Sequence, residues 1–201
     1  MIVGLTGGVA SGKSTVARML KQKGALLLDA DRIAREVVLP GEAAWSEIIA
    51  WLGPAIAGPD GAIDRGRLGE LVFADPEARQ RLNAIVHPRV IETFVRRTGE
   101  IEDRRGDAVL IYDVPLLIES RMDRLVDLVV VVYLPEEIQL LRLQGRDNLS
   151  REAALARMRA QLSLEEKRAH ADIIIDNRGS LGETARQVDR LWEKLQDRLK
   201  S

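Results

Sequence analysis

A glycine-rich segment near the start of the chain carries the clearest chemical signal in the sequence. Residues 7–14 read GGVASGKS and fit the pattern G-x-x-x-x-G-K-[ST] at every fixed position. In this pattern glycines let the main chain curl, so that successive N–H groups point into one concavity and bind phosphate oxygens. The ammonium of Lys13 then reaches the β- and γ-phosphates, and the hydroxyl of Ser14 can bind Mg²⁺. The spacing therefore predicts a binding site for ATP or another nucleoside triphosphate.

The surroundings of this segment favour a phosphate-binding loop (P-loop) over an ordinary glycine-rich turn. An apolar run at residues 2–6 precedes it, and a helical pattern over residues 14–23 follows it. The positive end of that helix adds to the attraction for an anion. The groups expected to contact the nucleotide are those of the loop and the start of the helix, namely Gly8, Ala10, Ser11, Gly12, Lys13, Ser14 and Thr15.

Carboxylates follow two of the apolar runs. Asp113 ends the run at residues 108–113, where P-loop proteins place a carboxylate that holds Mg²⁺, and its alternative role is to cap the next turn. Asp29 and Asp31 follow the run at residues 25–29. One of them could accept the proton of an attacking hydroxyl, while one could cap the next helix. We favour Asp31 for the chemistry, although the sequence leaves the choice of base open.

A basic helical stretch at residues 140–170 is typical of a lid that excludes water from a transfer reaction. Arg142 and Arg146 are one helical turn apart, so they face the same way and could clamp phosphates. Arg157 and Lys167 are further candidates. The alternative is a solvated basic helix face.

The remaining pattern predicts an α/β fold, specifically a P-loop NTPase fold with a five-stranded parallel sheet flanked by helices. The predicted strands are short apolar runs without polar alternation, at residues 2–6, 25–29, 108–113, 128–134 and 172–176. A last amphipathic helix over residues 181–200 has an apolar stripe made of Leu181, Ala185, Val188, Leu191, Leu195 and Leu199. We expect three parts: a nucleotide-binding core (1–32, 106–139 and 171–201), a helical substrate insertion (33–105) and the lid (140–170).

Composition narrows the class of protein. The 201 residues carry a formal net charge of −1, which gives no electrostatic support for nucleic-acid binding. Cysteine is absent and there are two histidines, so a disulfide framework or a zinc site is not expected. No apolar run approaches the roughly 20 residues that span a membrane. We expect a cytoplasmic protein that does not bind a membrane and that is a monomer or a weak homo-oligomer.

Taken together, these segments resemble the dephospho-coenzyme A kinase family along almost the whole chain. The matching strings, in chain order, are GLTGGVASGKST (4–15), DADRIAR (29–35), LNAIVHP (82–88), DVPLLIE (113–119), RD (146–147) and ADIIIDN (171–177). The first string indicates only P-loop proteins, whereas the others are more particular. Two departures are mild: Ala10 stands where many members have Gly, and Ile118 replaces a frequent Phe.

The resemblance implies transfer of the ATP γ-phosphate to the ribose 3′-hydroxyl of dephospho-CoA, giving CoA and ADP. It implies that Asp31 is the base, acting with Lys13 and Arg146. It places Arg146 and Asn177 beside the nucleotide, with Asn177 on the adenine side, and the helical spacing adds Arg142 to the nucleotide contacts that we expect. The residues that it places beside the substrate are Asp31, His87, Pro115 and Leu116.

Several alternatives remain open at this point. His87, expected in a turn before Pro88, could instead have a packing or capping role, and Trp45 and Trp51 could line a pantetheine groove, although core packing is favoured. Another small-molecule or nucleotide kinase would use the same loop, lid and carboxylate. A GTPase is disfavoured, because the chain lacks an Asn-Lys-x-Asp motif and an Asp-x-x-Gly after the third strand. A nucleic-acid-dependent ATPase is disfavoured by the charge.

Overall fold

The computed structural model describes residues 1–200, which form two compact units. The first, called the core unit, comprises Met1–Asp29 and the chain from Ile101 onward; the second, the helical unit, comprises Ala30–Glu100. The predicted division of the chain into three parts stays a prediction. None of the helices within residues 1–200 is long and apolar enough to cross a membrane.

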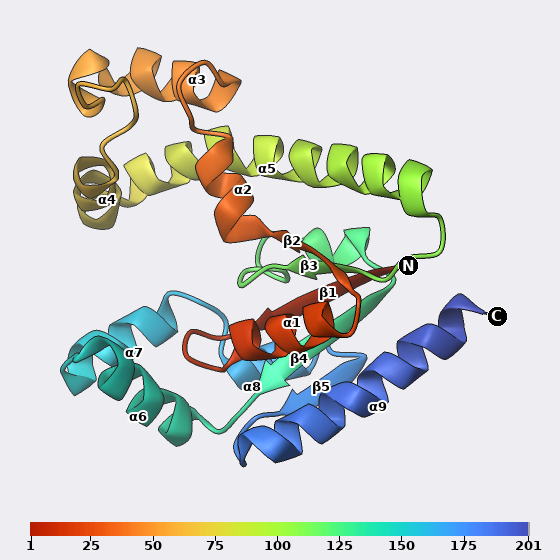
Figure 1. Cartoon of the computed structure of the whole chain (residues 1–201). Coiled ribbons are helices and arrows are strands. Elements are labelled where there is room, and N and C mark those ends of the chain that lie inside the picture. Colours follow the sequence, from red (N-terminus) through yellow and green to blue (C-terminus); the bar gives the residue numbers. More distant parts are fainter. Residues whose placement is uncertain (201) are drawn as a thin grey trace. The chain divides into compact units, whose positions relative to one another are not determined.

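The core unit contains a five-stranded parallel sheet in the order β2-β3-β1-β4-β5, as predicted (Figure 1). Its strands are β1 (Ile2–Gly7), β2 (Leu26–Asp29), β3 (Leu110–Asp113), β4 (Leu128–Tyr133) and β5 (Ile173–Asp176). Its helices are α1 (Lys13–Gln22), η2 (Met122–Leu125), α6 (Glu136–Asp147), α7 (Arg151–Arg159), α8 (Leu164–Arg168) and α9 (Leu181–Leu199). The five apolar runs thus form strands, with ends that differ from the predicted ones by one or two residues.

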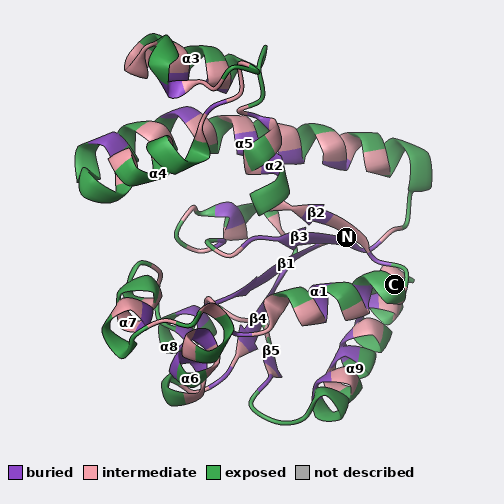
Figure 2. Ribbon diagram, turned by 60° about the vertical axis from the view of Figure 1, so that its left-hand side comes forward, coloured by how far each residue is buried: buried purple, intermediate pink, exposed green. Residues whose placement is uncertain are grey.

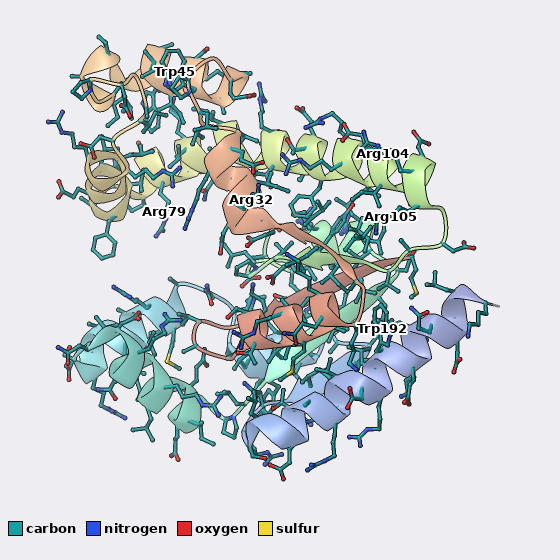
Figure 3. The ribbon with its side chains drawn as sticks, in the orientation of Figure 1. Arg32, Trp45, Arg79, Arg104, Arg105 and Trp192 are labelled. Carbon is teal, nitrogen blue, oxygen red and sulfur yellow. The ribbon has the colours of Figure 1, made fainter. Side chains whose placement is uncertain are left out.

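One face of the sheet is covered by α1 and α9, which lie side by side (Figures 1 and 2). Their buried side chains join those of the central strands in one hydrophobic cluster, and Trp192 of α9 packs against it (Figure 3). The predicted stripe of α9 is wrong at its first position. Leu181 is 61% exposed, whereas Thr184 is fully buried and faces the sheet with Val188. Leu181 is exposed because it opens the helix, directly after its N-cap Ser180.

The helices α6 and α7 lie beside the P-loop. α6 and α7 pack on each other through Leu140, Leu143 and Ala154, and Val9 and Ala10 of the P-loop pack against this cluster. α6 ends at Asn148, which has a positive φ of 51°, and α7 begins after Ser150, whose hydroxyl accepts from the Ala153 N–H. Asn148 and Ser150 thus form the turn between the two helices.

The helical unit consists of α2 (Ala30–Glu36), α3 (Ala43–Leu52), η1 (Pro54–Ile56), α4 (Arg65–Ala74) and most of α5 (Pro76–Arg105). As predicted, it has no strand, and only one isolated bridge joins Ala57 and Ile63. Trp45 and Trp51 pack against its core of aliphatic residues, and the Trp45 indole N–H donates to the Gly61 carbonyl at 2.8 Å (Figure 3). The core-packing interpretation of these tryptophans is confirmed.

Candidate active site

The P-loop joins β1 to α1, and its main chain has the curled shape that the glycine pattern predicts. Ala10 and Gly12 both have a positive φ, 59° and 91° respectively. The Ser11 N–H donates to the Gly8 carbonyl at 3.0 Å, and Gly12 caps α1, which begins at Lys13. A positive φ at two nearby positions turns successive N–H groups to one side, which produces an anion-binding concavity at the positive end of a helix.

Lys13 forms an ion pair with Asp113 at the base of this loop. Its Nζ atom lies 2.5 Å from Oδ1 of Asp113, and the two side chains are only 15% and 7% exposed. The pair is a consequence of sheet order, because β3 lies next to β1 with Leu5 opposite Asp113. The structure therefore brings together the predicted phosphate-binding cation and the predicted metal-binding carboxylate.

Asp29 lies at the same edge of the sheet. It ends β2 directly opposite Asp113, since β2 pairs with β3 in that register. The chain then enters α2, and Asp31 occupies the first turn of that helix, where a carboxylate is favoured by the helix dipole. Asp31 belongs to the helical unit, two residues along the chain from the sheet edge.

Asn177 follows β5 and contacts the P-loop itself. Its Nδ2 atom donates to the Ser11 carbonyl at 2.7 Å, and its Oδ1 atom accepts from the Thr184 hydroxyl at 2.7 Å. All three residues are buried. A Cβ at Gly12 would collide with the Asn177 amide, so this position requires glycine for steric reasons as well as for its positive φ.

A second ion pair joins Lys167 of α8 to Glu119, in the loop that follows β3. Lys167 is fully buried, and its ammonium contacts both carboxylate oxygens of Glu119, at 2.7 and 2.8 Å, and the Pro115 carbonyl at 2.9 Å. Burial lowers the pKa of Lys167, and the bonds to Glu119 oppose that shift. The expectation that Lys167 is a lid cation is therefore wrong, since α8 turns its side chain into the interior. Glu119, whose side chain is 22% exposed, is the counter-charge of this buried ammonium.

The Pro115 carbonyl also accepts from the Thr6 hydroxyl at 3.0 Å, at the end of β1. The Pro115 carbonyl thus accepts hydrogen bonds from β1, through Thr6, and from α8, through Lys167. Leu116, the neighbouring substrate candidate, is 37% exposed.

The two arginines for which a lid role is predicted lie on a helix, α6, with Arg142 partly buried and Arg146 exposed. Arg146 makes two bonds to Asp147, from Nε at 2.8 Å and from Nη2 at 3.0 Å. Asp147 also accepts from Arg157 of α7 at 2.7 Å. The bonds from Arg146, followed by the charges of both arginines, hold the pKa of Asp147 below its ordinary value.

His87 lies in the helical unit, inside α5, and not in the expected turn. The helix continues through Pro88, and His87 is exposed on its surface. The packing role that was the alternative for His87 is therefore not observed.

Two residues at this site were missed by sequence analysis. Gln139 of α6 and Gln161, between α7 and α8, bond the carbonyl and the N–H of Val9 in the P-loop. They lie 130 and 152 positions from Val9 in the sequence, so no local spacing connects them to it. Because their side chains are neutral, they also do not stand out among the charged residues of this part of the sequence.

With this geometry in place, comparison with known proteins defines the family. The family model for dephospho-CoA kinase matches residues 1–183. The chain belongs to the dephospho-CoA kinase family. A dephospho-CoA kinase from Thermobifida fusca is 50% identical over 200 residues, which are 99% of this chain and 98% of the relative. One from Carboxydothermus hydrogenoformans is 47% identical over 193 residues, or 96% of this chain and 93% of the relative.

Solved structures agree with this family and with the fold. The dephospho-CoA kinase from Campylobacter jejuni has a TM-score of 0.75 at 28% identity and covers 96% of both chains. A shikimate kinase from Acinetobacter baumannii, complexed with shikimate, has a TM-score of 0.51 at 18% identity, covering 98% of this chain and 93% of its own, which shows similarity of fold alone. Membership of the dephospho-CoA kinase family also makes ATP the expected phosphate donor.

Proposed function

We propose that this protein transfers the γ-phosphate of ATP to the ribose 3′-hydroxyl of dephospho-CoA, giving CoA and ADP in the last step of CoA biosynthesis. The observation that carries the proposal is the P-loop with Lys13 and Asp113 at its base, in a chain of the dephospho-CoA kinase family. Phosphoryl transfer depends mainly on positioning the reactants and on stabilising charge at the transferred group. In this site the P-loop main chain would do the first and the Lys13 ammonium the second.

We assign phosphate binding to the main chain of the P-loop and to Lys13. The N–H groups at the start of α1 and the Lys13 ammonium together face the negative charge that a triphosphate brings. Lys13 is already held at the base of the loop by Asp113, so little reorganisation is required when the phosphates arrive.

We assign Mg²⁺ to Ser14 and Asp113. Among residues 1–200, no cluster of three or more His, Asp or Glu side chains could hold a metal ion alone. Two oxygen donors nevertheless fit Mg²⁺, which is commonly bound by one or two protein groups together with phosphates and water. When bound, the ion would neutralise charge on the β- and γ-phosphates.

We assign the base role to Asp31, which would accept the proton of the 3′-hydroxyl as that oxygen attacks phosphorus. Asp29 remains the alternative base, and its place opposite Asp113 also suits it to organise the metal site. Arg142 and Arg146 would cover the transferred phosphate from α6, with Arg146 exchanging part of its contact with Asp147 for the nucleotide. For the substrate itself, His87, Pro115 and Leu116 are the proposed contacts.

A panel of acceptors tests this function. The purified protein with ATP and Mg²⁺ is given dephospho-CoA, adenosine, AMP or a simple alcohol, and ADP release is followed by a coupled assay. We expect dephospho-CoA to react far faster than the others and its product to be identical to CoA by mass and chromatography. Turnover of another acceptor, without turnover of dephospho-CoA, would leave only the general kinase assignment.

A further inference from the structure

Val9, in the middle of the P-loop, is held on both sides by glutamine side chains. Nε2 of Gln139 donates to the Val9 carbonyl at 2.8 Å, and Oε1 of Gln161 accepts from the Val9 N–H at 3.1 Å. Gln139 is 5% exposed. The two hydrogen bonds therefore fix the orientation of the Gly8–Val9 peptide group and of the Val9–Ala10 peptide group, both within the P-loop.

These contacts determine where the neighbouring N–H groups point. In a trans peptide the carbonyl and the following N–H point in opposite directions. Because Gln139 draws the Val9 carbonyl towards α6, the N–H of Ala10 is directed away from α6. Ala10 has a φ of 59°, which is unfavourable for a residue with a side chain, so an outside contact is needed to hold it there.

The identity of the two residues suits a phosphate site. One partner must donate to a carbonyl and the other must accept from an N–H, and a carboxamide can do either without carrying charge. A carboxylate at position 161 could accept the same bond but would repel a triphosphate. A lysine at position 139 could donate, but it would add a cation that competes with Lys13 for the phosphates.

Gly8 provides independent support for the role of Gln139. A Cβ at Gly8 would lie 2.5 Å from Nε2 of Gln139, so the glutamine occupies the space that any other residue would need. Gly8 stands at a variable position of the phosphate-binding pattern, so the pattern itself does not require glycine there. A side chain at position 8 would push against Gln139 where it contacts Val9.

The segment that carries Gln161 is itself fixed. The N–H of the next residue, Leu162, donates to Oε1 of Glu119 at 2.9 Å, and the same carboxylate pairs with the buried Lys167. Gln161 is thus held against the P-loop by bonds that reach the loop following β3.

We propose that Gln139 and Gln161 are positioning residues, which hold the P-loop in its anion-binding shape before ATP arrives. The proposal rests on the proposed use of ATP, but not on the identity of the acceptor. Neither residue touches the phosphates in this role. Each acts through the Val9 peptides, so α6 and the segment between α7 and α8 thereby contribute to the affinity for nucleotide.

The test compares Gln161→Leu, Gln139→Leu and Gln161→Glu with the control Gln196→Leu, which lies on α9 and away from the P-loop. Binding of a fluorescent ATP analogue is measured with Mg²⁺ and without any acceptor, together with the melting temperature. We expect each Leu variant to bind the analogue about tenfold more weakly, since one neutral hydrogen bond contributes on that scale. The control should bind as wild type does.

Two further readouts separate positioning from simple stability. Gln161→Glu keeps an acceptor for the Val9 N–H, so we expect it to melt like wild type yet to bind the analogue more weakly. In turnover assays KM for ATP should rise while KM for the acceptor is unchanged. Wild-type affinity for the ATP analogue in a folded Gln161→Leu variant would overturn the proposal, whatever the result for Gln139→Leu. Weak binding that disappears when each variant is assayed well below its melting temperature would also overturn it.

Discussion

Lys13 and Asp113 form an ion pair in which Nζ lies 2.5 Å from Oδ1, so the cation of the P-loop is bound to the carboxylate at the end of β3. The pair thus joins the residue proposed to bind phosphate, Lys13, directly to the residue proposed to bind Mg²⁺, Asp113. Because both side chains are nearly buried, replacing either one leaves its partner without its main counter-charge. The two single substitutions should therefore have different and recognisable effects.

Replacing Lys13 should impair the use of ATP itself. Lys13→Ala removes the ammonium that would stabilise charge on the transferred phosphate, and we expect kcat to fall by roughly a hundredfold or more. ADP release with saturating dephospho-CoA measures the effect. Lys23→Ala is a matched control, since Lys23 pairs with Asp189 at the surface, and it should retain normal turnover. Equal rates for the two variants would remove Lys13 from the mechanism.

Replacing Asp113 should change the dependence on metal. Asp113→Asn keeps the shape of the side chain but removes its charge, so we expect the Mg²⁺ concentration for half-maximal rate to rise by about tenfold or more. Titration of the rate with Mg²⁺ at fixed ATP measures this. Asp127→Asn, far from the P-loop at the start of β4, is the control. An unchanged Mg²⁺ curve with a merely lower plateau would indicate that Asp113 acts only by holding Lys13.

The sheet and the P-loop were predictable because their signals are local. Five apolar runs became the five strands, and the fixed spacing of Gly7, Gly12 and Lys13 located the phosphate site. The turn between α6 and α7 is likewise formed by neighbouring residues, among them Asn148 and Ser150. Each of these features is determined by residues that are close together in the chain.

The features that sequence analysis missed depend on contacts between distant segments. A basic stretch containing Lys167 looks the same whether its side chains face solvent or the interior, and only the packing of α8 shows that Lys167 pairs with Glu119. Gln139 and Gln161 could not be found for the same reason. Leu181 fits the helical stripe by spacing, but it is the first residue of α9 and is exposed, while Thr184 is the first buried residue of the helix.

Asp31 should be needed for transfer but not for nucleotide binding. Asp31→Asn cannot accept the proton of the attacking hydroxyl, so we expect kcat to fall by roughly 10²–10⁴-fold while the affinity for an ATP analogue is largely kept. Rates and analogue binding are measured on the same preparation, with Asp103→Asn on α5 as the control. A near-normal rate would exclude Asp31 as the base, and Asp29→Asn would then become the decisive variant.

The ion pair of Arg146 and Asp147 on α6 predicts a shifted pKa for the Asp147 carboxyl. Arg146 bonds Asp147 and lowers its pKa below the ordinary value of 3.8, with a smaller effect from Arg157. Since the folded pKa is the lower one, the contribution of the pair to stability is complete above the unfolded pKa and is lost as pH falls through the folded pKa. A titration of the Asp147 carboxyl by ¹³C NMR should give a pKa below 3.8, and Arg146→Gln should raise it. An unshifted pKa in the wild type would show that the pair does not persist in solution.

The ion pair of the buried Lys167 with Glu119 should matter more for stability when one partner is removed than when both are removed. Lys167→Met leaves the Glu119 carboxylate, whose side chain is 22% exposed, without its cation, and we expect a cost of about 1–3 kcal/mol in the free energy of unfolding. Replacing both residues with apolar ones, as in Lys167→Met with Glu119→Leu, should recover much of that loss, because the desolvation of both charges is avoided. Urea unfolding of the two variants measures the difference. A double variant no more stable than Lys167→Met would mean that the bonds of Glu119 to Leu162, and not the charge of Lys167, hold the segment beside the P-loop.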